Sequence, residues 1–432
     1  MLLSQTCPTQ AFLHPDDLAA WVAGREAPAS YHQTSTPTAL SPLKLFSLND
    51  YLGLASHPDV CSAASQVVLQ YGMGPRSSAL VGGYTSYHRE LEQGLAGLKG
   101  TEECLLFPTG FAANMGTLAA LAGSEDVAIY SDELNHASII DGARLATRNT
   151  PPSVSSSSGS SSGNSSSGGN RLHIYRHNDL AHLEQLLRAA PPRQRRLVVT
   201  DSLFSMDGDF ADLPGLAALK ARHDFLLMVD EAHATLVCGE HGGGAAEAMG
   251  VAHHVDVHVG TLSKAFGALG GFVATSRAIK AYLLNRSRPF VYSTSLPLPV
   301  VAAASAALHV SQRESWRRRH VWALTTELSA RLRVPALSPV IPLVIGSEEA
   351  TLQLSSRLLA AGLHVPAIRP PTVPAGTCRL RVSLSSALSH GDVAQLADLV
   401  LASGATLQHL PHLVAQKRSG VAECCRADTS RP

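Results

Sequence analysis

The sequence lacks an excess of charge of either sign. Its 432 residues include 34 lysines and arginines and 34 aspartates and glutamates, so the formal net charge is zero. Proteins that bind nucleic acid or anionic membranes mainly through electrostatics carry a strongly basic surface. The balance of charge therefore argues against nucleic acid and membrane as the main partners of this chain.

Long apolar runs and metal-type cysteine pairs are also missing. The longest apolar stretch, residues 297–310, is shorter than the about 18 residues that a membrane-spanning helix needs. None of the seven cysteines forms a CxxC pair, which argues against a zinc or thioredoxin-like site. We expect no metal, and the odd cysteine number without a secretory signal favours a reducing compartment.

Targeting signals are weak at both ends of the chain. The first 24 residues contain no lysine or arginine, whereas a secretory or transit peptide is basic. The C-terminal Ser430-Arg431-Pro432 matches a peroxisomal tripeptide in two positions but not in the last one. We therefore expect a cytoplasmic protein, with the peroxisome as the alternative.

Seven short apolar runs alternate with helical patterns in the first two thirds of the chain. Continuous apolar strands between helices are typical of a mostly parallel sheet that is covered on both faces. Ligands bind such sheets beyond the carboxyl ends of the strands. The sequence thus predicts an α/β fold with a seven-stranded, mostly parallel sheet. The predicted strands are Cys104–Phe107, Val127–Tyr130, Leu172–Tyr175, Leu197–Thr200, Phe225–Val229, Val255–Val259 and Gly271–Thr275.

The same patterns divide the chain into segments. A long helix over about 299–333, a strand at Val340–Ile345, a helix at about 349–361 and a strand at Arg379–Ser383 predict a second, smaller α/β domain. The predicted segments are an N-terminal helix and lead-in over 1–57, a large domain over 58–298 with a connector from 276 to about 300, a small domain over 299–410, and a tail over 411–432.

Residues 151–170 form a low-complexity insertion within the large domain. Eleven of the eighteen residues from Ser153 to Asn170 are serine and four are glycine. Such a segment cannot bury apolar area, so we expect it to be a disordered surface spacer.

Lys264 and Asp230 are the strongest candidates for chemistry. Lys264 stands among small and hydroxylic residues after one apolar strand, and Asp230 directly follows another. Pyridoxal 5′-phosphate (PLP) needs a lysine for its Schiff base and an anion that keeps its pyridine nitrogen protonated. A buried lysine can also act as a base. Asp230 could alternatively be a helix N-cap, but its pairing with Lys264 favours a PLP site.

Three further positions suit the same cofactor. Thr109 and Gly110 open a predicted helix, where backbone N–H groups and the helix dipole bind phosphate. His136 offers a flat ring that could stack on the cofactor, and His233 could contact its phenolic oxygen. By contrast, the histidines at 253, 254 and 258 do not predict a metal site, because the residues between 254 and 258 are typical of a strand. The run Arg317-Arg318-Arg319 predicts a solvated helix face.

Taken in order, these motifs resemble those of the α-oxoamine synthases, PLP enzymes of fold type I, from about Leu48 to Leu399. Within that family, Ile368–Thr377 followed by Arg379-Leu380-Arg381 is most similar to plant or algal members that make 8-amino-7-oxononanoate for biotin synthesis. The matching motifs are Asn49-Asp50-Tyr51-Leu52-Gly53-Leu54, Gly74-Pro75-Arg76-Ser77-Ser78, Gly82-Gly83-Tyr84, Ser131 to Ser138, Phe204 to Asp209, Asp230-Glu231-Ala232-His233 and Thr261-Leu262-Ser263-Lys264.

The resemblance implies roles for individual residues. Lys264 would be the Schiff-base lysine and proton-transfer base, Asp230 the partner of the ring nitrogen, and His136 and His233 its other ring contacts. The remaining implied positions are Thr261, Gly110 and Phe111 for the phosphate, Ser293 or Thr294 for the phosphate of a neighbouring subunit, and Asn49, Ser205 and Arg381 for the carboxylate of the amino acid.

The resemblance also implies an activity and an assembly. The expected reaction condenses L-alanine with pimeloyl-CoA, or with a pimeloyl-carrier protein, in a homodimer whose active sites lie at the subunit interface. Two alternatives stay open. One is a glycine-using relative, such as 5-aminolevulinate synthase or 2-amino-3-ketobutyrate CoA ligase. The other is a non-catalytic partner subunit with the same fold.

Overall fold

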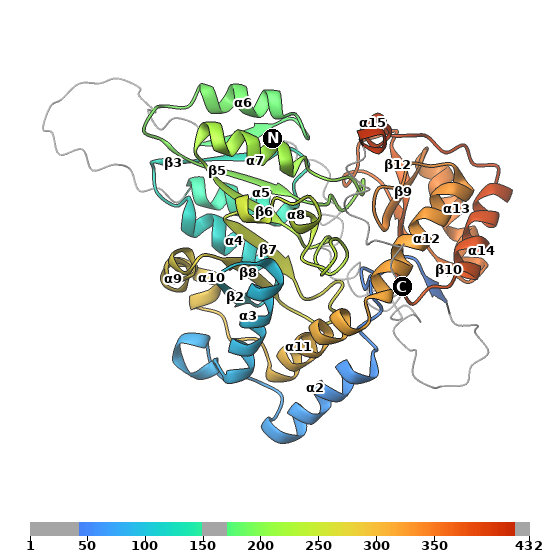
Figure 1. The fold of residues 1–432 in the computed structure, drawn as a ribbon. Coiled ribbons are helices and arrows are strands. Elements are labelled where there is room, and N and C mark those ends of the chain that lie inside the picture. The colour runs from blue at the N-terminus through green and yellow to red at the C-terminus, as the bar shows by residue number, and fades with distance from the viewer. Residues whose placement is uncertain (1–42, 149–170, 420–432) are drawn as a thin grey trace, which may run out of the picture.

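The large domain is built on a seven-stranded sheet, as predicted. The computed structural model describes residues 43–148 and 171–419, and Figure 1 shows their arrangement. The strand order is β2-β8-β7-β6-β5-β3-β4, and only β8 runs antiparallel to its neighbours. The strands are β2 (Glu103–Phe107), β3 (Val127–Asp132), β4 (Leu172–Tyr175), β5 (Arg195–Asp201), β6 (Leu226–Asp230), β7 (Val257–Thr261) and β8 (Gly271–Thr275).

Helices cover both faces of this sheet because successive strand side chains point to opposite sides. Leu105 and Phe107 of β2 pack into one apolar cluster, whereas Cys104 and Leu106 pack into another. The first face is covered by α4 (Gly110–Leu121), α5 (Ala137–Arg148), α9 (Arg277–Arg286) and α10 (Arg288–Val291). The second is covered by α3 (Ser86–Lys99), α6 (Leu180–Arg188), α7 (Leu213–His223), α8 (Ala245–Ala248) and α11 (Leu298–Arg313), with α2 (Pro58–Tyr71) against α11.

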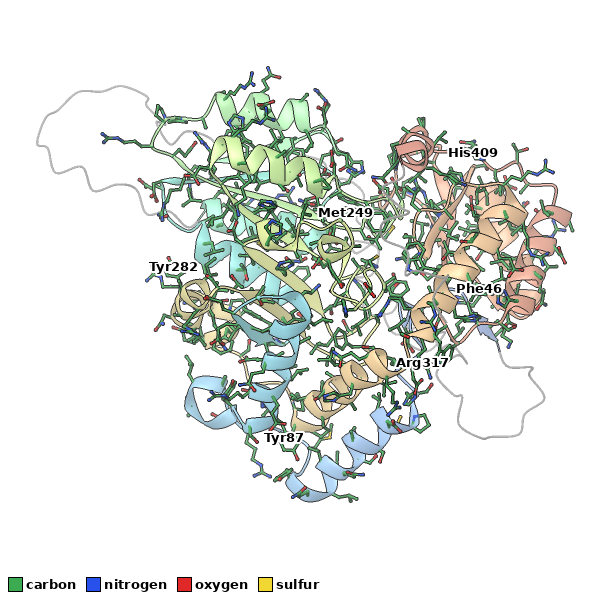
Figure 2. The ribbon with its side chains drawn as sticks, viewed as in Figure 1. Phe46, Tyr87, Met249, Tyr282, Arg317 and His409 are labelled. Carbon is green, nitrogen blue, oxygen red and sulfur yellow. The ribbon has the colours of Figure 1, made fainter. Side chains whose placement is uncertain are left out.

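The small domain has its own apolar core around an antiparallel sheet of order β11-β12-β9. Phe46, near the start of the described chain, is buried in this core (Figure 2). The short β1 (Lys44–Leu45) pairs with β10 (Leu363–His364) beside it. The other elements are β9 (Val340–Gly346), β11 (Ala367–Ile368), β12 (Cys378–Ser383), α12 (Trp316–Leu332), α13 (Glu348–Ala360) and α14 (His390–Ala402).

Three expectations about regular structure were wrong. The long helix predicted over 299–333 is two helices, α11 and α12, because Glu314 leaves the helical conformation (φ −107°, ψ 53°) and its carboxylate pairs with Arg313 and Arg317. The predicted connector contains α9 and α10. The arginine run is not a solvated face, since Arg318 is buried and donates to the carbonyl of Glu240 at 2.6 Å.

The predicted tail also contains structure. Residues Pro411–Ser419 form α15, and Leu413 is buried in the core of the large domain. The chain therefore leaves the small domain after α14 and returns to the large one. A single leucine at this position carries no periodic signal, which explains why the pattern missed the helix.

The predicted insertion at 151–170 and the N-terminal helix before residue 43 lie outside the described residues. Among the described helices, none combines the length and apolar character needed to cross a bilayer. The remaining short elements are a π-helical turn, η3 (Ala79–Gly83), and a 3₁₀ turn, η4 (Ala252–His254).

Candidate functional site

One pocket at the carboxyl edge of the large sheet collects most of the predicted site residues. Its cavity volume is about 240 Å³, and its lining includes Lys264, Asp230, His136 and His233. Its other lining residues are Thr109, Gly110, Phe111, Asn114, Ser138, Asp201, Ser205, Ala232, Thr261 and Ser263. Nine of the residues selected from sequence thus meet at one place, although they come from segments up to 155 positions apart, from Thr109 to Lys264.

The register of three parallel strands creates the floor of this pocket. Asp201 at the end of β5 lies opposite Asp230 at the end of β6, and Asp230 lies opposite Val259 of β7. Thr261, the last residue of β7, lies two residues after Val259. Asp230 and Thr261 therefore end their strands, rather than following them as expected from the sequence.

Lys264 lies in the turn after β7 and is held there by a close backbone approach. The Lys264 carbonyl accepts a hydrogen bond from Gly267 N at 2.8 Å. Gly267 has φ +64°, and a Cβ there would lie 2.2 Å from the backbone nitrogen of Ala55, so only glycine fits. Burial lowers the pKa of Lys264, although Asp230 and Asp201 oppose this effect. The amine is thus more easily deprotonated than an exposed lysine.

Asp230 is a buried carboxylate fixed by neutral donors. Its Oδ2 accepts from Asn114 Nδ2 at 2.6 Å, and its Oδ1 accepts from the backbone N–H of Ala232 at 2.8 Å. Asn114 also donates to Ser138 Oγ at 2.9 Å, which bonds His136 Nδ1 at 2.7 Å. The chain Asp230–Asn114–Ser138–His136 sets the carboxylate and the imidazole relative to each other.

Both pocket histidines are held as neutral rings. Burial lowers the pKa of His136, and it lowers that of His233 well below the usual value, with a further contribution from Lys264. His233 Nδ1 bonds the Tyr51 hydroxyl at 2.6 Å. Neutral imidazoles can donate one hydrogen bond and accept another, so neither ring adds positive charge near Lys264.

Asn49 and Arg381 are brought to the edge of the same site by contacts with its residues. Arg381 donates to Asn49 Oδ1 at 3.2 Å and to the carbonyl of Ser205 at 2.5 Å. Asn49 Oδ1 also accepts from Tyr51, the partner of His233. Arg381 comes from β12 of the small domain, so the site lies where the two domains meet.

The start of α4 forms a further wall with exposed backbone donors. Thr109 is the N-cap and accepts from Ala112 N at 3.0 Å. A Cβ on Gly110 would lie only 3.2 Å from the Cβ of Thr261, so glycine leaves the helix start open toward the pocket. Helix N-termini of this kind attract phosphate.

Ser293 and Thr294 do not line this pocket within the single chain. They line a separate, smaller cavity with Tyr84 and His88, and Thr294 forms a bridge with Ser78. Their expected contact with the phosphate of a neighbouring subunit stays a prediction.

The sequence analysis missed four residues that shape the site. Asp201 could have been found, because it follows a buried strand just as Asp230 does. Burial and the Asp230 carboxylate raise the pKa of Asp201 well above its usual value, and its Oδ2 accepts from His136 N at 2.7 Å. Asn114, Ser138 and Tyr51 offered no such signal, since only the tertiary structure brings them to Asp230 or His233.

A fully buried ion pair supports the turn that carries Asp230 and His233. Glu231 accepts from Lys99 Nζ at 2.6 Å and contacts His258 Nδ1 at 3.0 Å. Burial alone would raise the pKa of Glu231, but Lys99 and His258 lower it to about 2. His258, which was given no role from the sequence, lies within β7 and bonds this buried carboxylate.

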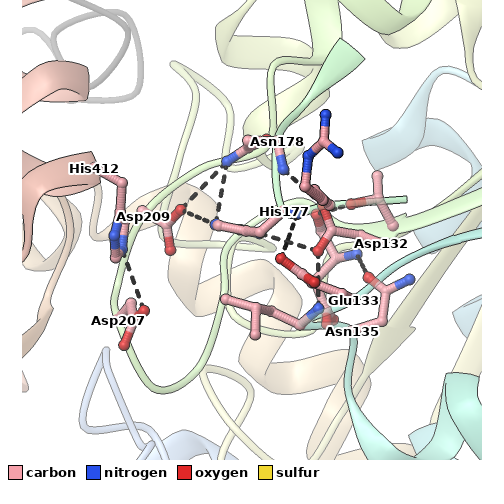
Figure 3. A network of polar contacts seen from close by, with 12 residues as sticks. Asp132, Glu133, Asn135, His177, Asn178, Asp207, Asp209 and His412 are labelled. Carbon is pink, nitrogen blue, oxygen red and sulfur yellow. Dashed lines mark hydrogen bonds and ion pairs between the residues drawn. The ribbon is translucent and has the colours of Figure 1, made fainter. Parts of the chain in front are cut away.

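A second buried network lies beside the pocket and centres on His177 (Figure 3). Its Nδ1 faces Asp132 at 3.0 Å and its Nε2 faces Asp209 at 2.7 Å. Burial alone would lower the pKa of His177, but hydrogen bonds to these two carboxylates raise it to about 10. The imidazolium thus joins the end of β3 to the loop after β5, which carries Ser205.

The chain is similar in sequence to known proteins. The family described as aminotransferase class I and II matches residues 42–400. An 8-amino-7-oxononanoate synthase from Arabidopsis thaliana is 47% identical, over 87% of this chain and 78% of its own length. One from Anaeromyxobacter dehalogenans is 45% identical, over 84% of this chain and 86% of its own length.

Solved structures agree with the fold. A serine palmitoyltransferase from Sphingomonas wittichii is 31% identical with a TM-score of 0.78, over 94% of this chain and 98% of its own. Another, from S. paucimobilis with PLP and myriocin bound, is 28% identical with a TM-score of 0.75, over 84% and 87%. An 8-amino-7-oxononanoate synthase from Francisella tularensis, 24% identical with a TM-score of 0.67 over 84% and 98%, shares the fold.

The contacts of His177 with Asp132 and Asp209, called the His177 clamp below, predict that the stability of the folded chain depends on pH. Its pKa of about 10 in the folded chain lies above the usual 6.5, so its contribution is complete below about pH 6.5 and is lost as pH rises through about 10. We expect His177→Gln to lower the free energy of unfolding by about 3 kcal/mol near neutral pH and by less at high pH. Urea unfolding of the wild-type and variant proteins, once near neutral pH and once at high pH, measures the loss of stability under each condition.

His390→Gln is a matched control for that measurement. The side chain of His390 is 61% exposed and pairs with Glu327 at the surface. Its loss should cost less than about 1 kcal/mol at either pH. A His177→Gln protein whose destabilisation did not shrink at high pH would contradict the clamp.

Proposed function

The chain belongs to the aminotransferase class I and II family, and on that premise we propose that it makes 8-amino-7-oxononanoate from L-alanine and a pimeloyl thioester. The chain is a PLP-dependent, acyltransferase-type enzyme of the α-oxoamine synthase group. The observation that carries the proposal is a partly buried lysine and a buried carboxylate in one pocket, in a chain 45–47% identical to synthases of that name.

The residues of the pocket fit PLP. Asp230 is only 5% exposed and its two hydrogen-bond donors are neutral, which suits a cationic ring nitrogen as a third partner. Asn114 Oδ1 is buried without a hydrogen-bond partner among the described residues. The open helix start at Gly110 suits the phosphate. Lys264 would bond the aldehyde, His136 would stack on the ring, His233 would contact the phenolic oxygen, and Thr109, Phe111 and Thr261 would complete the phosphate site.

The chain's own groups supply binding, orientation and proton transfer. When bound, PLP provides an aldehyde that captures the amine and a cationic ring that takes up the electron pair left at Cα. Lys264, with its lowered pKa, accepts the Cα proton of alanine and can return it to the product. Asp230 would face the ring nitrogen with its carboxylate, whose direction is fixed by the hydrogen bond from Asn114.

Arg381 and Asn49 orient the amino acid. A guanidinium binds a carboxylate through two parallel hydrogen bonds, which sets the angle of the bonds at Cα. In the proposed reaction a new bond joins Cα to the thioester carbonyl carbon. The thiol leaves with a proton, and the carboxylate of alanine departs as CO₂. Positioning at the Arg381 subsite therefore governs which bond at Cα breaks.

Two alternatives are weaker. A glycine-using relative would share Lys264, Asp230 and His136, so only the substrates separate it from the proposal. A non-catalytic partner subunit is disfavoured because these three side chains meet in one pocket. The cytoplasmic location expected from the sequence stays a prediction.

Lys264→Ala tests the role of the lysine. We expect the activity to fall by at least about 10³-fold, since the base and the covalent attachment are both lost. The visible absorbance of the lysine-bound cofactor should disappear as well. Lys44→Ala is the control, because Lys44 is half exposed on β1 of the small domain and should leave both readouts unchanged. Turnover of Lys264→Ala at the wild-type rate would contradict the assignment of Lys264 as the base and the attachment point of the cofactor.

Product identification tests the substrates. Purified enzyme with alanine and pimeloyl-CoA should release CoA and give 8-amino-7-oxononanoate by mass spectrometry. Glycine in place of alanine, and succinyl- or acetyl-CoA in place of pimeloyl-CoA, should be at least about tenfold poorer by kcat/KM. Preferred use of glycine with succinyl- or acetyl-CoA would instead support one of the glycine-using relatives.

We also propose that the chain works as a homodimer through the face around η3. Leu80 and Val81 in η3 are 55% and 83% exposed, and Tyr292 is 72% exposed. Exposed apolar side chains that cluster in this way are typical of interfaces. Thr294, whose partner is Ser78 just before η3, lies at the same face and could reach a neighbouring pocket.

Val81→Asp tests this interface. A charge at the most exposed apolar side chain of η3 should convert the dimer to a monomer and lower the affinity for PLP. Light scattering reads the mass, and fluorescence titration reads the cofactor. Leu401→Asp is the control, since Leu401 is 58% exposed on the small domain and should remain dimeric. An unchanged mass for Val81→Asp would place the interface elsewhere.

A further inference from the structure

The C-terminal helix α15 lies beyond residues 42–400, the part of the chain that the family matches. It nevertheless packs on the large domain, with Leu413 only 2% exposed in the main core and Leu410 beside it. Before α15, Gln408 is bonded to Val344 of the small domain. The segment therefore contacts both domains, and Figure 1 shows α15 beside β12 and β9 of the small domain.

Two side chains of α15 hold the loop after β5. Gln416 uses both ends of its amide on one residue, because its Oε1 accepts from Phe210 N at 2.9 Å and its Nε2 donates to Phe210 O at 2.6 Å. His412 Nε2 lies 3.2 Å from Asp207 Oδ2, and Figure 3 shows the two side chains facing each other. Burial would raise the pKa of Asp207, but His412 and Arg379 lower it.

The same loop forms one side of the amino-acid subsite. It closes on itself through the Leu203–Phe210 bridge and the hydrogen bond from Phe204 N to Asp209 O at 2.9 Å. Between these points lies Ser205, whose side chain lines the pocket and whose carbonyl accepts from Arg381 Nε at 2.5 Å. Any shift of Asp207 or Phe210 would therefore move the carbonyl that fixes Arg381.

We propose that α15 is a brace for the amino-acid subsite, with His412 and Gln416 as positioning residues that act through the 203–210 loop on Ser205 and Arg381. The inference rests on the proposed function, because it takes Arg381 as the group that binds the substrate carboxylate. Lys264, Asp230 and His136 belong to other elements, so the brace affects amino-acid binding more than the chemical step.

A metal site is the competing explanation for this cluster. Ligand atoms of His177, Asp209 and His412 all lie within 4.8 Å of one another. Both ring nitrogens of His177, however, face carboxylates, Asp132 at 3.0 Å and Asp209 at 2.7 Å. Each nitrogen must carry a proton to donate, which leaves no lone pair for a metal ion. The arrangement favours a brace in which His177 is hydrogen-bonded to both carboxylates and His412 contacts Asp207.

The test compares the holoenzyme with a His412→Leu/Gln416→Leu variant. Loss of these contacts should raise hydrogen exchange in peptides covering 203–211, and it should raise both the Kd and the KM for L-alanine about tenfold. The Kd is read from the cofactor spectrum without any thioester. We expect kcat and the KM for the thioester to change less than about twofold. His412 and Gln416 act on the amino-acid subsite and not on the groups that carry out the chemical step.

Two single variants separate positioning from a general loss of structure. His412→Gln, made as a single substitution, keeps an N–H near the position of Nε2. We expect this variant to bind alanine with the wild-type affinity. Lys417→Ala lies on the same helix, but Lys417 donates to Ser329 of α12 at 3.4 Å and not to the 203–210 loop among the described contacts, so this variant should leave exchange and affinity unchanged. If the double variant does not fold, His412→Leu alone replaces it. We then expect the logarithm of the Kd for alanine to rise by half as much as in the double variant.

Several results would overturn the brace. One is a folded double variant with wild-type exchange in 203–211 and wild-type alanine affinity. Another is an equal loss in kcat and in the KM for the thioester, which would indicate a general structural defect. Stoichiometric metal in the purified protein, with EDTA weakening alanine binding, would favour the metal site. Failure of the proposed function looks different, since wild-type enzyme would then show no spectral response to alanine while the exchange data still report on the loop.

Discussion

The alignment of three parallel strands is the constraint on which the rest of the site depends. The register of β5, β6 and β7 places Asp201, Asp230 and Thr261 at one edge of the sheet. Two buried carboxylates so close together repel each other in a medium of low polarity. The structure relieves this by hydrogen bonds from Asn114, from Ala232 N and from His136 N, and by favouring the neutral form of Asp201.

The turns beyond those strands are held by buried polar groups as well as by apolar packing. Lys99 and His258 fix Glu231 directly after Asp230, and His177 joins the end of β3 to the loop of Ser205. Such groups are costly to bury, and they are stable only because each has a charged partner. They fix directions that apolar contacts would leave loose, which a site for proton transfer and carboxylate binding requires.

The limits of sequence reasoning have physical causes that differ between residues. Lys264 and Asp230 were found because they follow apolar strands, a local pattern. Asn114 lies within α4 and has no local feature that distinguishes it from a solvent-facing amide. Arg318 looked solvated because it stands in a basic run, yet the fold turns it toward the carbonyl of Glu240. The prediction of an unstructured tail missed α15, because one buried leucine in nine residues gives no periodic pattern of apolar positions.

The sequence by itself determined the fold class, nine of the twelve strands that the structure describes, each within two residues of its ends, and the identity of nine pocket residues. It missed the short strands β1, β10 and β11. These properties depend on hydrophobic periodicity and on short motifs, which are local. Only the tertiary structure decided that Asn114, Ser138 and Tyr51 contact Asp230, His136 and His233, that Arg381 reaches Ser205 from a second domain, and that Gln416 of α15 bonds Phe210. Most of these contacts join residues far apart in the chain, and their geometry is set by how the two domains pack, which no local pattern encodes.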